Sequence, residues 1–362
     1  LVCIGGSTSA KSTKLLINSV TKLSDYNLSV VHIPKTIFND LPLPGDAYTF
    51  GYSTAREEGC KLAASLIRDT RTMSNWNILI VKGTKSGHLA LEIGKTAAAT
   101  FTIIPEQFKD LDNTSYISFQ DVVTLVASSI YKRLYMKKNY GCVVIAEGLI
   151  DLINKKDIET IFGTMENALN LFGHYLSLEL QKEFSSVHTI NKILTRNIGS
   201  ELCAAKPNVE DISLTRDLGF ASIRYLINGG NGDIICKSLG EIVNIPLNTI
   251  KVDQSISTLR LVNLKQINYQ VAVNYMIYIT LEDLNNPLFL EKISEYASCS
   301  ISQFISKYQP VLRNFTFNEQ SKQDTTIFQE KDFKRVNTKR SLSQEKLHEL
   351  FHDHDDQQQQ QH

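Results

Sequence analysis

The chain lacks the features that would place it in a membrane or on a nucleic acid. No apolar run approaches the roughly 20 residues that a membrane-spanning helix requires. A surplus of one charge is also lacking, because lysine plus arginine and aspartate plus glutamate both number 38 among 362 residues. Without a net field, attraction to a polyanion is weak. These absences predict a soluble globular chain that binds neither a membrane nor a nucleic acid.

Cysteine is scarce and scattered. The cysteines form no CxxC pair, so the sequence indicates neither a zinc site nor a disulfide framework. They stand at Cys3, Cys60, Cys142, Cys203, Cys236 and Cys299. This usage fits a reducing, cytoplasmic setting.

Short β-rich runs alternate regularly with helical patterns up to residue 148. This alternation predicts an α/β fold with a doubly wound parallel sheet in two lobes. The nearly all-apolar strands imply helices on both faces, and ligands of such sheets gather where the strands end. The expected strands are 1–6, 28–34, 77–83, 100–106 and 141–148, and the expected helices are 11–23, 54–71, 89–98 and 121–137.

The second half of the chain has a different pattern. Apolar residues at helical spacing predict a helical insertion at about 152–195. A further helix at 212–227 ends at "NGGNGD", whose glycines favour a helix cap over a phosphate cradle because no strand leads into them. A strand pair is expected at 234–247. The polar end beside a glutamine tract predicts a disordered tail rather than a metal site.

These patterns divide the chain into four expected parts. They are a first α/β lobe of 1–50 plus about 200–262, a second α/β lobe of 51–199, a helical region of 263–314 and a disordered tail of 315–362. The chain begins within an expected strand and without a methionine. We therefore expect the N-terminal part of the first lobe to be missing.

Three ordered stretches carry a resemblance to a known family: "PKTIFNDLPLPGDAYTFGYSTAR", "GHLALEIGKTAAATFTIIPEQF" and "YGCVVIAEGLID". On these stretches, the chain resembles the 6-phosphofructokinases of the long, pyrophosphate-dependent type, from residue 1 to about 247. The resemblance implies the glycolytic phosphorylation of fructose 6-phosphate at O1 by ATP or pyrophosphate, assisted by Mg²⁺. Such a transfer needs a metal on the phosphates, cationic clamps and an acceptor for the hydroxyl proton.

The positions that the resemblance assigns to metal and base have changed. After the first strand, the family reads GGD followed by Gly or Asp, and its aspartate serves the metal, whereas this chain has Ser7 and Thr8. Magnesium prefers carboxylate oxygens to neutral hydroxyls. The family's PKTIDND places its proton-accepting aspartate where Phe38 stands here. Loss of a general base typically removes roughly 100- to 10,000-fold of rate, so the sequence predicts an extinct active site that binds no magnesium.

The sugar-phosphate contacts have changed as well. The family's MGR triplet appears as "KGT", with Thr84 at the arginine position, and its G-Y-E-x-R pattern aligns with "GSELC". This alignment puts Ser200 at the tyrosine and Cys203 at the arginine. Threonine and cysteine cannot hold a phosphate through the bidentate fork that arginine offers. We expect weakened binding of the sugar phosphate.

Some family positions are retained. The resemblance implies phosphate or donor contacts from Gly5, Gly6, Lys35, Thr36 and Asp40, and a hydrogen bond from Glu147 to sugar hydroxyls. The glycines, Asp40 and Glu147 also have structural explanations, as a strand-to-helix turn, a turn cap and an ion pair. Lys35 is the strongest candidate for retained anion binding. His88 opens an expected helix and is interpreted as a packing residue.

Two functions are compatible with this pattern. The first is a pseudoenzyme that accompanies a catalytic phosphofructokinase chain or domain, similar to the regulatory α subunits of plant-type pyrophosphate-dependent enzymes, which also carry a GG-x-T-S loop. Such a chain could also bind a phosphorylated metabolite. The second is an active ATP- or pyrophosphate-dependent enzyme with a composite site. Arg68 and Arg71 could reach a neighbour's phosphate, or could simply be solvated at a helix end.

Overall fold

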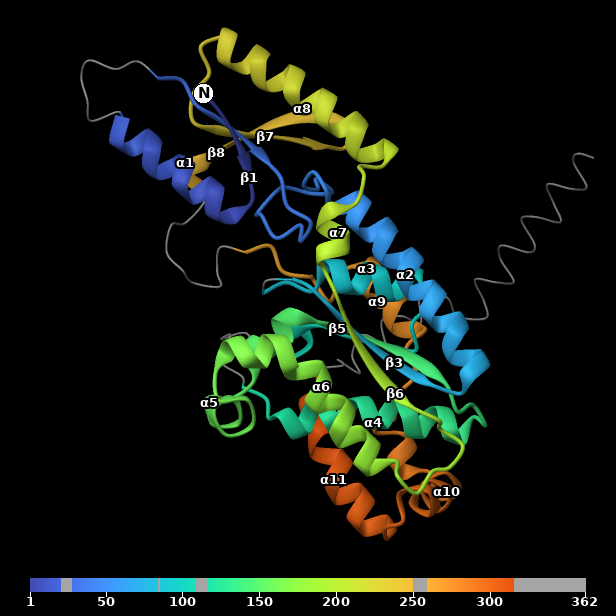
Figure 1. Cartoon of the computed structure of the whole chain (residues 1–362). Helices are drawn as coiled ribbons and strands as arrows, with labels where there is room; N and C mark the ends of the chain where they lie inside the picture. Colours follow the sequence, from blue (N-terminus) through green and yellow to red (C-terminus); the bar gives the residue numbers. More distant parts are fainter. Residues whose placement is uncertain (21–27, 84, 109–115, 250–258, 316–362) are drawn as a thin grey trace, which may run out of the picture. The chain divides into compact units, whose positions relative to one another are not determined.

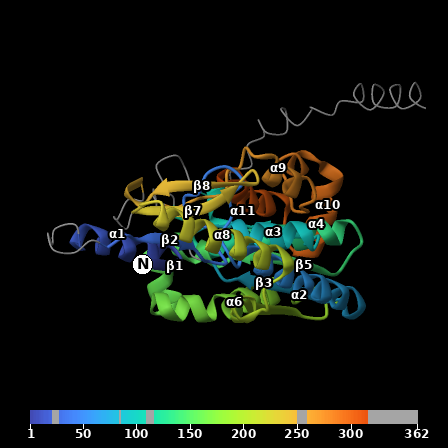
Figure 2. The same ribbon diagram turned by 90° about the horizontal axis from the view of Figure 1, so that it is seen from above.

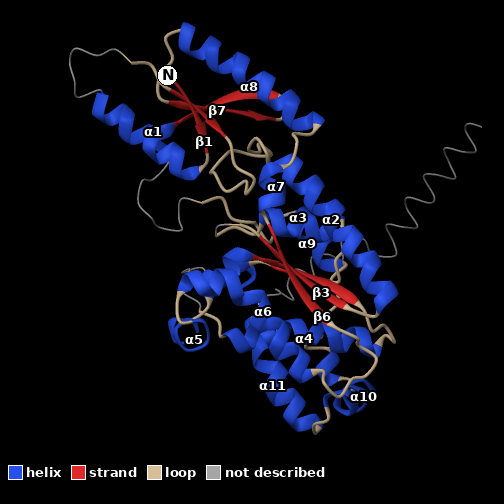
Figure 3. Cartoon of the chain, in the orientation of Figure 1, coloured by secondary structure: helices blue, strands red, loops and turns tan. Residues whose placement is uncertain are grey.

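The computed structural model describes residues 1–20, 28–83, 85–108, 116–249 and 259–315. These residues form two four-stranded sheets, each flanked by helices (Figure 1; Figure 3, strands in red). The prediction of an α/β fold with parallel sheets is confirmed. None of the described helices is long and apolar enough to cross a membrane.

The first sheet has the strand order β1–β2–β7–β8. Its first three strands are parallel, and β8 returns antiparallel to β7 as the expected strand pair. The strands are β1 (Val2–Gly5), β2 (Val31–Pro34), β7 (Asp233–Ser238) and β8 (Glu241–Pro246). Helix α1 (Ser7–Val20) packs on one face of the sheet and α8 (Val209–Ile227) on the other. Neighbouring β7 residues point to opposite faces, and some pack with α1 while the next packs with α8.

The second sheet is fully parallel, with the order β4–β5–β3–β6. Its strands are β3 (Trp76–Val81), β4 (Phe101–Ile103), β5 (Gly141–Ala146) and β6 (Ile193–Ile198). Helices cover both faces, so β3 and β5 are buried over their whole lengths. Helices α2 (Tyr52–Met73) and α3 (His88–Thr96) lie on one face, and α4 (Phe119–Tyr135) and α6 (Met165–Glu183) on the other (Figure 1).

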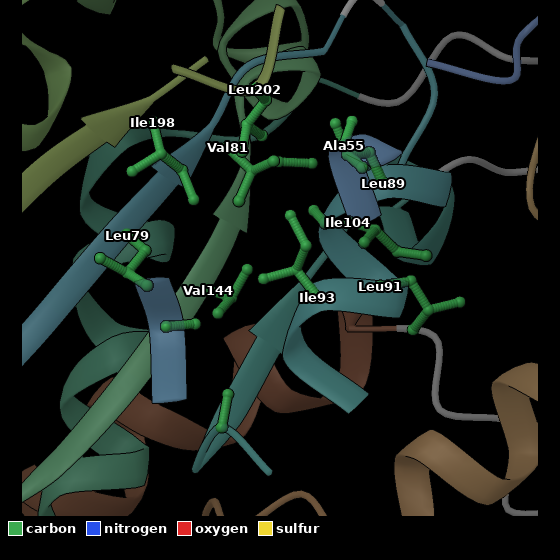
Figure 4. Close-up of a cluster of buried hydrophobic side chains, with 14 of the residues drawn as sticks. Ala55, Leu79, Val81, Leu89, Leu91, Ile93, Ile104, Val144, Ile198 and Leu202 are labelled. Carbon is green, nitrogen blue, oxygen red and sulfur yellow. The ribbon is translucent and has the colours of Figure 1, made fainter. Parts of the chain in front are cut away.

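The core of the second lobe lies between its sheet and helices α2 and α3. Leu79 and Val81 of β3 and Val144 of β5 meet Leu89 and Ile93 of α3 (Figure 4). We call this group, with the other members of the same buried cluster, the second-lobe core. Its side chains are almost fully excluded from solvent, which makes it a large source of hydrophobic stabilisation.

Strand β6 was not predicted. The sequence indicated a helical insertion to about residue 195, but the helical part ends at Glu183 and β6 begins at Ile193. The strand escaped notice because it forms the sheet edge, where Arg196 and Asn197 are exposed and weaken the apolar signal. The insertion consists of α5 (Lys155–Asp157), a π-helical turn (Ile158–Phe162) and α6.

The C-terminal described residues are helical. Helices α9 (Ile267–Asn274), α10 (Pro287–Ala297) and α11 (Ile301–Asn314) pack against the second lobe, with α9 and α6 at opposite margins in Figure 2. Shorter elements are Pro105–Phe108, Glu147–Leu152, α7 (Ser200–Ala204), Leu247–Thr249 and Asp283–Asn285. Phe315 was expected in the disordered tail, but its ring is buried against Phe101 and Phe108. The rest of the expected tail, 316–362, lies outside the described residues.

A buried carboxylate joins helices of the two lobes. Asp211 of α8 is 0% exposed and accepts hydrogen bonds from the backbone N–H groups of Gly51, at 2.9 Å, and Thr54, at 2.8 Å. The Thr54 hydroxyl donates to the same carboxylate. Because these donors lie at the N-terminus of α2, a side chain of one lobe caps a helix of the other.

Candidate functional site

The loops that follow β1 and β2 lie side by side. The two strands are parallel neighbours, and the Lys35 N–H donates to the Gly5 carbonyl at 2.9 Å. Gly5 is needed for close packing, because a Cβ there would lie 2.1 Å from the Ser9 Oγ. Ser7 opens α1 and is half-buried, while Thr8 is exposed. The residues expected at a metal position therefore begin a helix.

Hydrogen bonds fix the loop after β2. The Thr36 N–H donates to the Phe50 carbonyl at 3.1 Å, and the Thr36 Oγ1 accepts from the Phe38 N–H at 3.2 Å. The Thr36 carbonyl accepts from the Thr49 hydroxyl at 2.6 Å. These bonds tie Thr36 into the loop and leave Lys35, whose side chain is exposed, as the cation of this loop.

The side chain of Phe38 is part of the packing between the lobes. It is half-buried and contacts the second-lobe core, to which Ile37 and Tyr52 also belong. The position that the family resemblance assigns to a proton acceptor is thus occupied by an apolar ring in apolar surroundings. Asp40, two residues further on, is only 2% exposed.

A buried histidine, which sequence reasoning missed, stabilises the turn after β1 through hydrogen bonds. His32 in β2 is 0% exposed, with Nε2 3.1 Å from the Gly5 carbonyl and Nδ1 3.4 Å from the Thr13 Oγ1. Burial lowers the pKa of His32 to about 4, so the ring is neutral at pH 7 and holds the Gly5 turn through hydrogen bonds. A polar residue inside the apolar run "SVVHIP" was the available signal.

Glu147 and Gly83 form the corresponding contact in the second lobe. β3 and β5 are parallel neighbours, and beyond their ends Glu147 Oε2 accepts a hydrogen bond from the Gly83 N–H at 3.1 Å. The partner is a backbone amide rather than the lysine or arginine that was expected. Thr84, at the lost arginine position, lies outside the described residues.

His88 is the first residue of α3 and follows the loop that contains Gly83. Burial lowers its pKa to about 4, and its Nε2 has no hydrogen-bond partner among the described residues. Nearby, the Glu106 carboxylate accepts from the Gly87 N–H at 2.9 Å and from the Val262 N–H at 3.0 Å. A neutral, largely buried ring at a helix start is compatible with the packing role expected from the sequence.

One chain segment links the loops of the two lobes. The Arg260 N–H donates to the Asp40 carbonyl at 2.9 Å, and the Arg260 guanidinium donates to the carbonyls of Gly45, at 2.7 Å, and Ala47. Two residues later, Val262 binds Glu106 of the second lobe. The segment from Arg260 to Val262 therefore connects the loop after β2 with the second lobe.

The remaining predicted positions lie on exposed helices. Ser200 and Cys203 are both exposed on α7, which follows β6. Arg68 and Arg71 are exposed near the C-terminus of α2. In the described residues, no three histidine, cysteine, aspartate or glutamate side chains are grouped so that they could hold a metal ion.

Two open cavities lie beside the contact between α2 and α8. One has a volume of about 900 Å³ and the other about 560 Å³, and Arg56, Val209 and Glu210 line both. The Arg56 guanidinium is 3.6 Å from the Glu210 carboxylate and 3.9 Å from that of Glu92. These distances indicate a loose ion-pair network that is worth little in solvent.

Comparison with known proteins identifies relatives along most of the chain. The profile of the family described as Phosphofructokinase matches residues 1–226. The pyrophosphate–fructose 6-phosphate 1-phosphotransferase of Naegleria fowleri is 35% identical over 323 residues, which cover 85% of this chain and 73% of that protein. The enzyme of the same name from Thermotoga maritima is 33% identical and covers 85% of this chain and 74% of its own.

Solved structures support the same fold. A pyrophosphate-dependent phosphofructokinase from Nitrosospira multiformis superimposes with a TM-score of 0.53 at 15% identity, over 82% of this chain and 66% of that chain. The phosphofructokinase of Saccharomyces cerevisiae gives a TM-score of 0.50 at 17% identity, over 82% of this chain and 36% of that chain. At these identities, the likeness concerns the fold alone.

Proposed function

Because this chain belongs to the phosphofructokinase family, we propose that it is a non-catalytic member that acts beside a catalytic copy of the family. The observation that carries the proposal is Phe38, which occupies the expected proton-acceptor position and packs against the second-lobe core. A phenyl ring cannot take the hydroxyl proton. Phosphoryl transfer relies on positioned charges, so a loss at this point is costly.

The residues around the expected metal position do not fit magnesium. Mg²⁺ is usually bound by one or two carboxylates together with waters and substrate phosphates. Here Ser7 and Thr8 offer neutral hydroxyls, and the carboxylate-bearing Asp40 is 2% exposed. These residues are therefore not expected to hold the ion.

The competing function is an active enzyme with a composite site. Within the chain it would need a carboxylate at the position of Phe38, and the nearby candidates are Asp40 and Asp46. Asp46 accepts hydrogen bonds from the Ser238 hydroxyl at 2.8 Å and the Leu239 N–H at 2.9 Å, which lower its pKa. Asp46 is thus engaged with the β7–β8 hairpin, which favours the non-catalytic function.

Lys35 supports a retained binding role. Its side chain is exposed, and its backbone N–H is bonded to the Gly5 carbonyl, so the residue joins the Gly5–Gly6 turn and could offer its cation to a phosphorylated metabolite bound there. Isothermal titration calorimetry of the chain with fructose 6-phosphate and, separately, with pyrophosphate tests this role. Binding that Lys35→Ala weakens and Lys11→Ala leaves unchanged is expected; no binding of either compound contradicts it.

The kinase assay tests the main proposal. The purified chain, given fructose 6-phosphate, Mg²⁺ and either ATP or pyrophosphate, should show no turnover above a no-enzyme control. Phe38→Asp should not restore activity, because the metal and sugar-phosphate positions are changed independently. Mg²⁺-dependent turnover by the unmodified chain would overturn the proposal.

Partnership needs a separate measurement. Co-purification of this chain from its native source should recover a catalytic phosphofructokinase copy, either as a second chain or as part of the same polypeptide. Recovery as a lone monomer contradicts the partnership and leaves the kinase result unaffected.

A further inference from the structure

The outer face of α8 exposes an unusual amount of apolar surface. Large side chains there have exposed fractions between 40% and 82%. They are Val209, Ile212, Phe220, Ile223 and Ile227. The opposite face of the helix packs normally, since Leu214, Leu218 and Ser222 are at most 4% exposed. Helix α8 is therefore apolar on two faces, which is typical of a helix with a second contact.

The exposed residues follow the helical repeat along the whole of α8. Together with Arg216, they are spaced three or four residues apart, so that they form one continuous stripe. We call these six residues the α8 stripe. The 19 residues of α8 span about 28 Å at 1.5 Å per residue. This is long enough for several turns of helix-to-helix contact.

The α8 stripe is close to symmetric about Leu218. Val209 and Ile227 lie nine residues before and after Leu218, and Arg216 and Phe220 lie two before and after it. Two copies of the stripe, laid antiparallel, would therefore bring apolar ends against apolar ends. At the centre, each Arg216 would meet the other copy's Phe220.

The central contact is favourable for a cation and an aromatic ring. The Arg224 guanidinium already lies 5.6 Å from the Phe220 ring centroid within the same helix. The second face of that ring would suit Arg216 of another copy through the same attraction. Close approach is possible at this point, because a Cβ at Gly219 would meet nothing within 4 Å.

We propose that two copies of this chain pair through the α8 stripe, antiparallel about a two-fold axis near Leu218. A two-fold contact requires a surface that complements itself, and the order of residues in the stripe meets this condition. The proposal is independent of whether the chain is catalytic. One helix pair covers less than the ~800 Å² per partner of a standard interface, so the dimer should be weak and depend on concentration.

Sedimentation velocity on the full chain tests the pairing. Between ~1 and ~100 µM, the chain should pass from monomer to dimer, as expected for an interface of this size. Ile223→Glu and Ile227→Glu should weaken the dimer at least about tenfold. Leu288→Glu is the matched control, because Leu288 is 73% exposed on α10, away from the stripe. Monomer throughout this range, or an equal effect of the control, overturns the proposal.

Cysteine cross-linking tests the orientation. Under mild oxidation, a mixture of Val209→Cys and Ile227→Cys chains carrying different tags should form a mixed dimer. Either variant alone should form no more cross-linked dimer than the unmodified chain, which controls for the native cysteines. A Val209→Cys chain that cross-links to itself indicates a parallel contact and overturns the symmetry. A stable dimer that survives Ile227→Glu shows that another surface is used.

A different occupant of the stripe would have its own signature. If another segment of the polypeptide covers α8, the full chain stays monomeric and Phe220→Cys resists a thiol reagent. The labelling of the unmodified chain, which reports the native cysteines, is subtracted, and the remaining reaction rate is compared with that of Leu288→Cys. Slow labelling of Phe220→Cys in a monomer overturns the dimer, whereas labelling that slows only as the concentration rises supports it.

Discussion

The two sheets of this chain differ in how completely they are buried. In the second sheet, β3 and β5 are buried along their whole lengths between helices. In the first, Ile4 of β1 is 61% exposed and α8 presents its apolar stripe outward. The second lobe therefore holds the more complete core, while the first lobe carries the changed loops and the exposed apolar surface. Phe38 connects the two, since a first-lobe loop residue packs against the second-lobe core.

The largest expected effect compares a buried side chain with an exposed one. Leu79 is 0% exposed in the second-lobe core and Ile4 is 61% exposed at the edge of the first sheet. Leu79→Ala should lower the free energy of unfolding by about 3 to 5 kcal/mol through lost burial and a cavity, whereas Ile4→Ala should change it by less than about 1 kcal/mol. Chemical denaturation monitored by circular dichroism measures both, and equal losses would show that the sheets do not differ.

The next effect concerns the link between the lobes. Asp211→Ala removes the acceptor for two N–H groups and a hydroxyl at the start of α2, which should cost about 2 to 4 kcal/mol. The sole tryptophan, Trp76, lies in β3 and reports on the second lobe alone. In the variant, its fluorescence should change at higher denaturant than the circular dichroism. Glu210→Gln changes the exposed residue next to Asp211 and serves as the control. If fluorescence and circular dichroism change at the same denaturant concentration in Asp211→Ala, Asp211 does not join the lobes.

The sequence predicted most elements of the fold because the strands are distinctive. Runs such as "GCVVIA" in β5 are apolar throughout, as expected of a parallel strand covered on both faces. Strand β6 was missed because edge strands tolerate polar residues. The role of Asp211 was also missed, since its partner Thr54 lies 157 residues away and only the folded chain brings them together.

The candidate site was partly accessible from the sequence for the same reason. Motif positions such as Phe38 and Glu147 could be placed at strand ends, because the alternation of strands and helices fixes where loops fall. Their contacts could not be predicted. The packing of Phe38 against the second-lobe core and the hydrogen bond from Gly83 to Glu147 depend on tertiary geometry.

Acid provides a third test, directed at the first lobe. The pKa of His32 is about 4 in the folded chain and 6.5 when exposed, so the unfolded state binds more protons between these values. The contribution of His32 to the free energy of unfolding is fully present above about pH 6.5 and is lost as the pH drops towards 4. The loss from this residue is up to about 3 kcal/mol. His32→Asn should flatten the profile measured by denaturation from pH 7 to 4. His88 should maintain a similar slope in the second lobe, and a profile unchanged by His32→Asn contradicts the assignment.

The smallest expected effect is at the other end of α2. Its N-terminus is capped by the buried Asp211, whereas Arg68 and Arg71 near its C-terminus are exposed. Positive charge is favourable there through the helix dipole, but solvent screens the interaction, so Arg68→Ala and Arg71→Ala should each cost less than about 0.5 kcal/mol. Denaturation of each variant beside Asp211→Ala compares the two ends of one helix. A loss above about 1 kcal/mol from either arginine would reveal a structural contact at the exposed end. Unchanged stability with reduced activity of an added catalytic copy would instead show that the arginine serves a neighbouring chain.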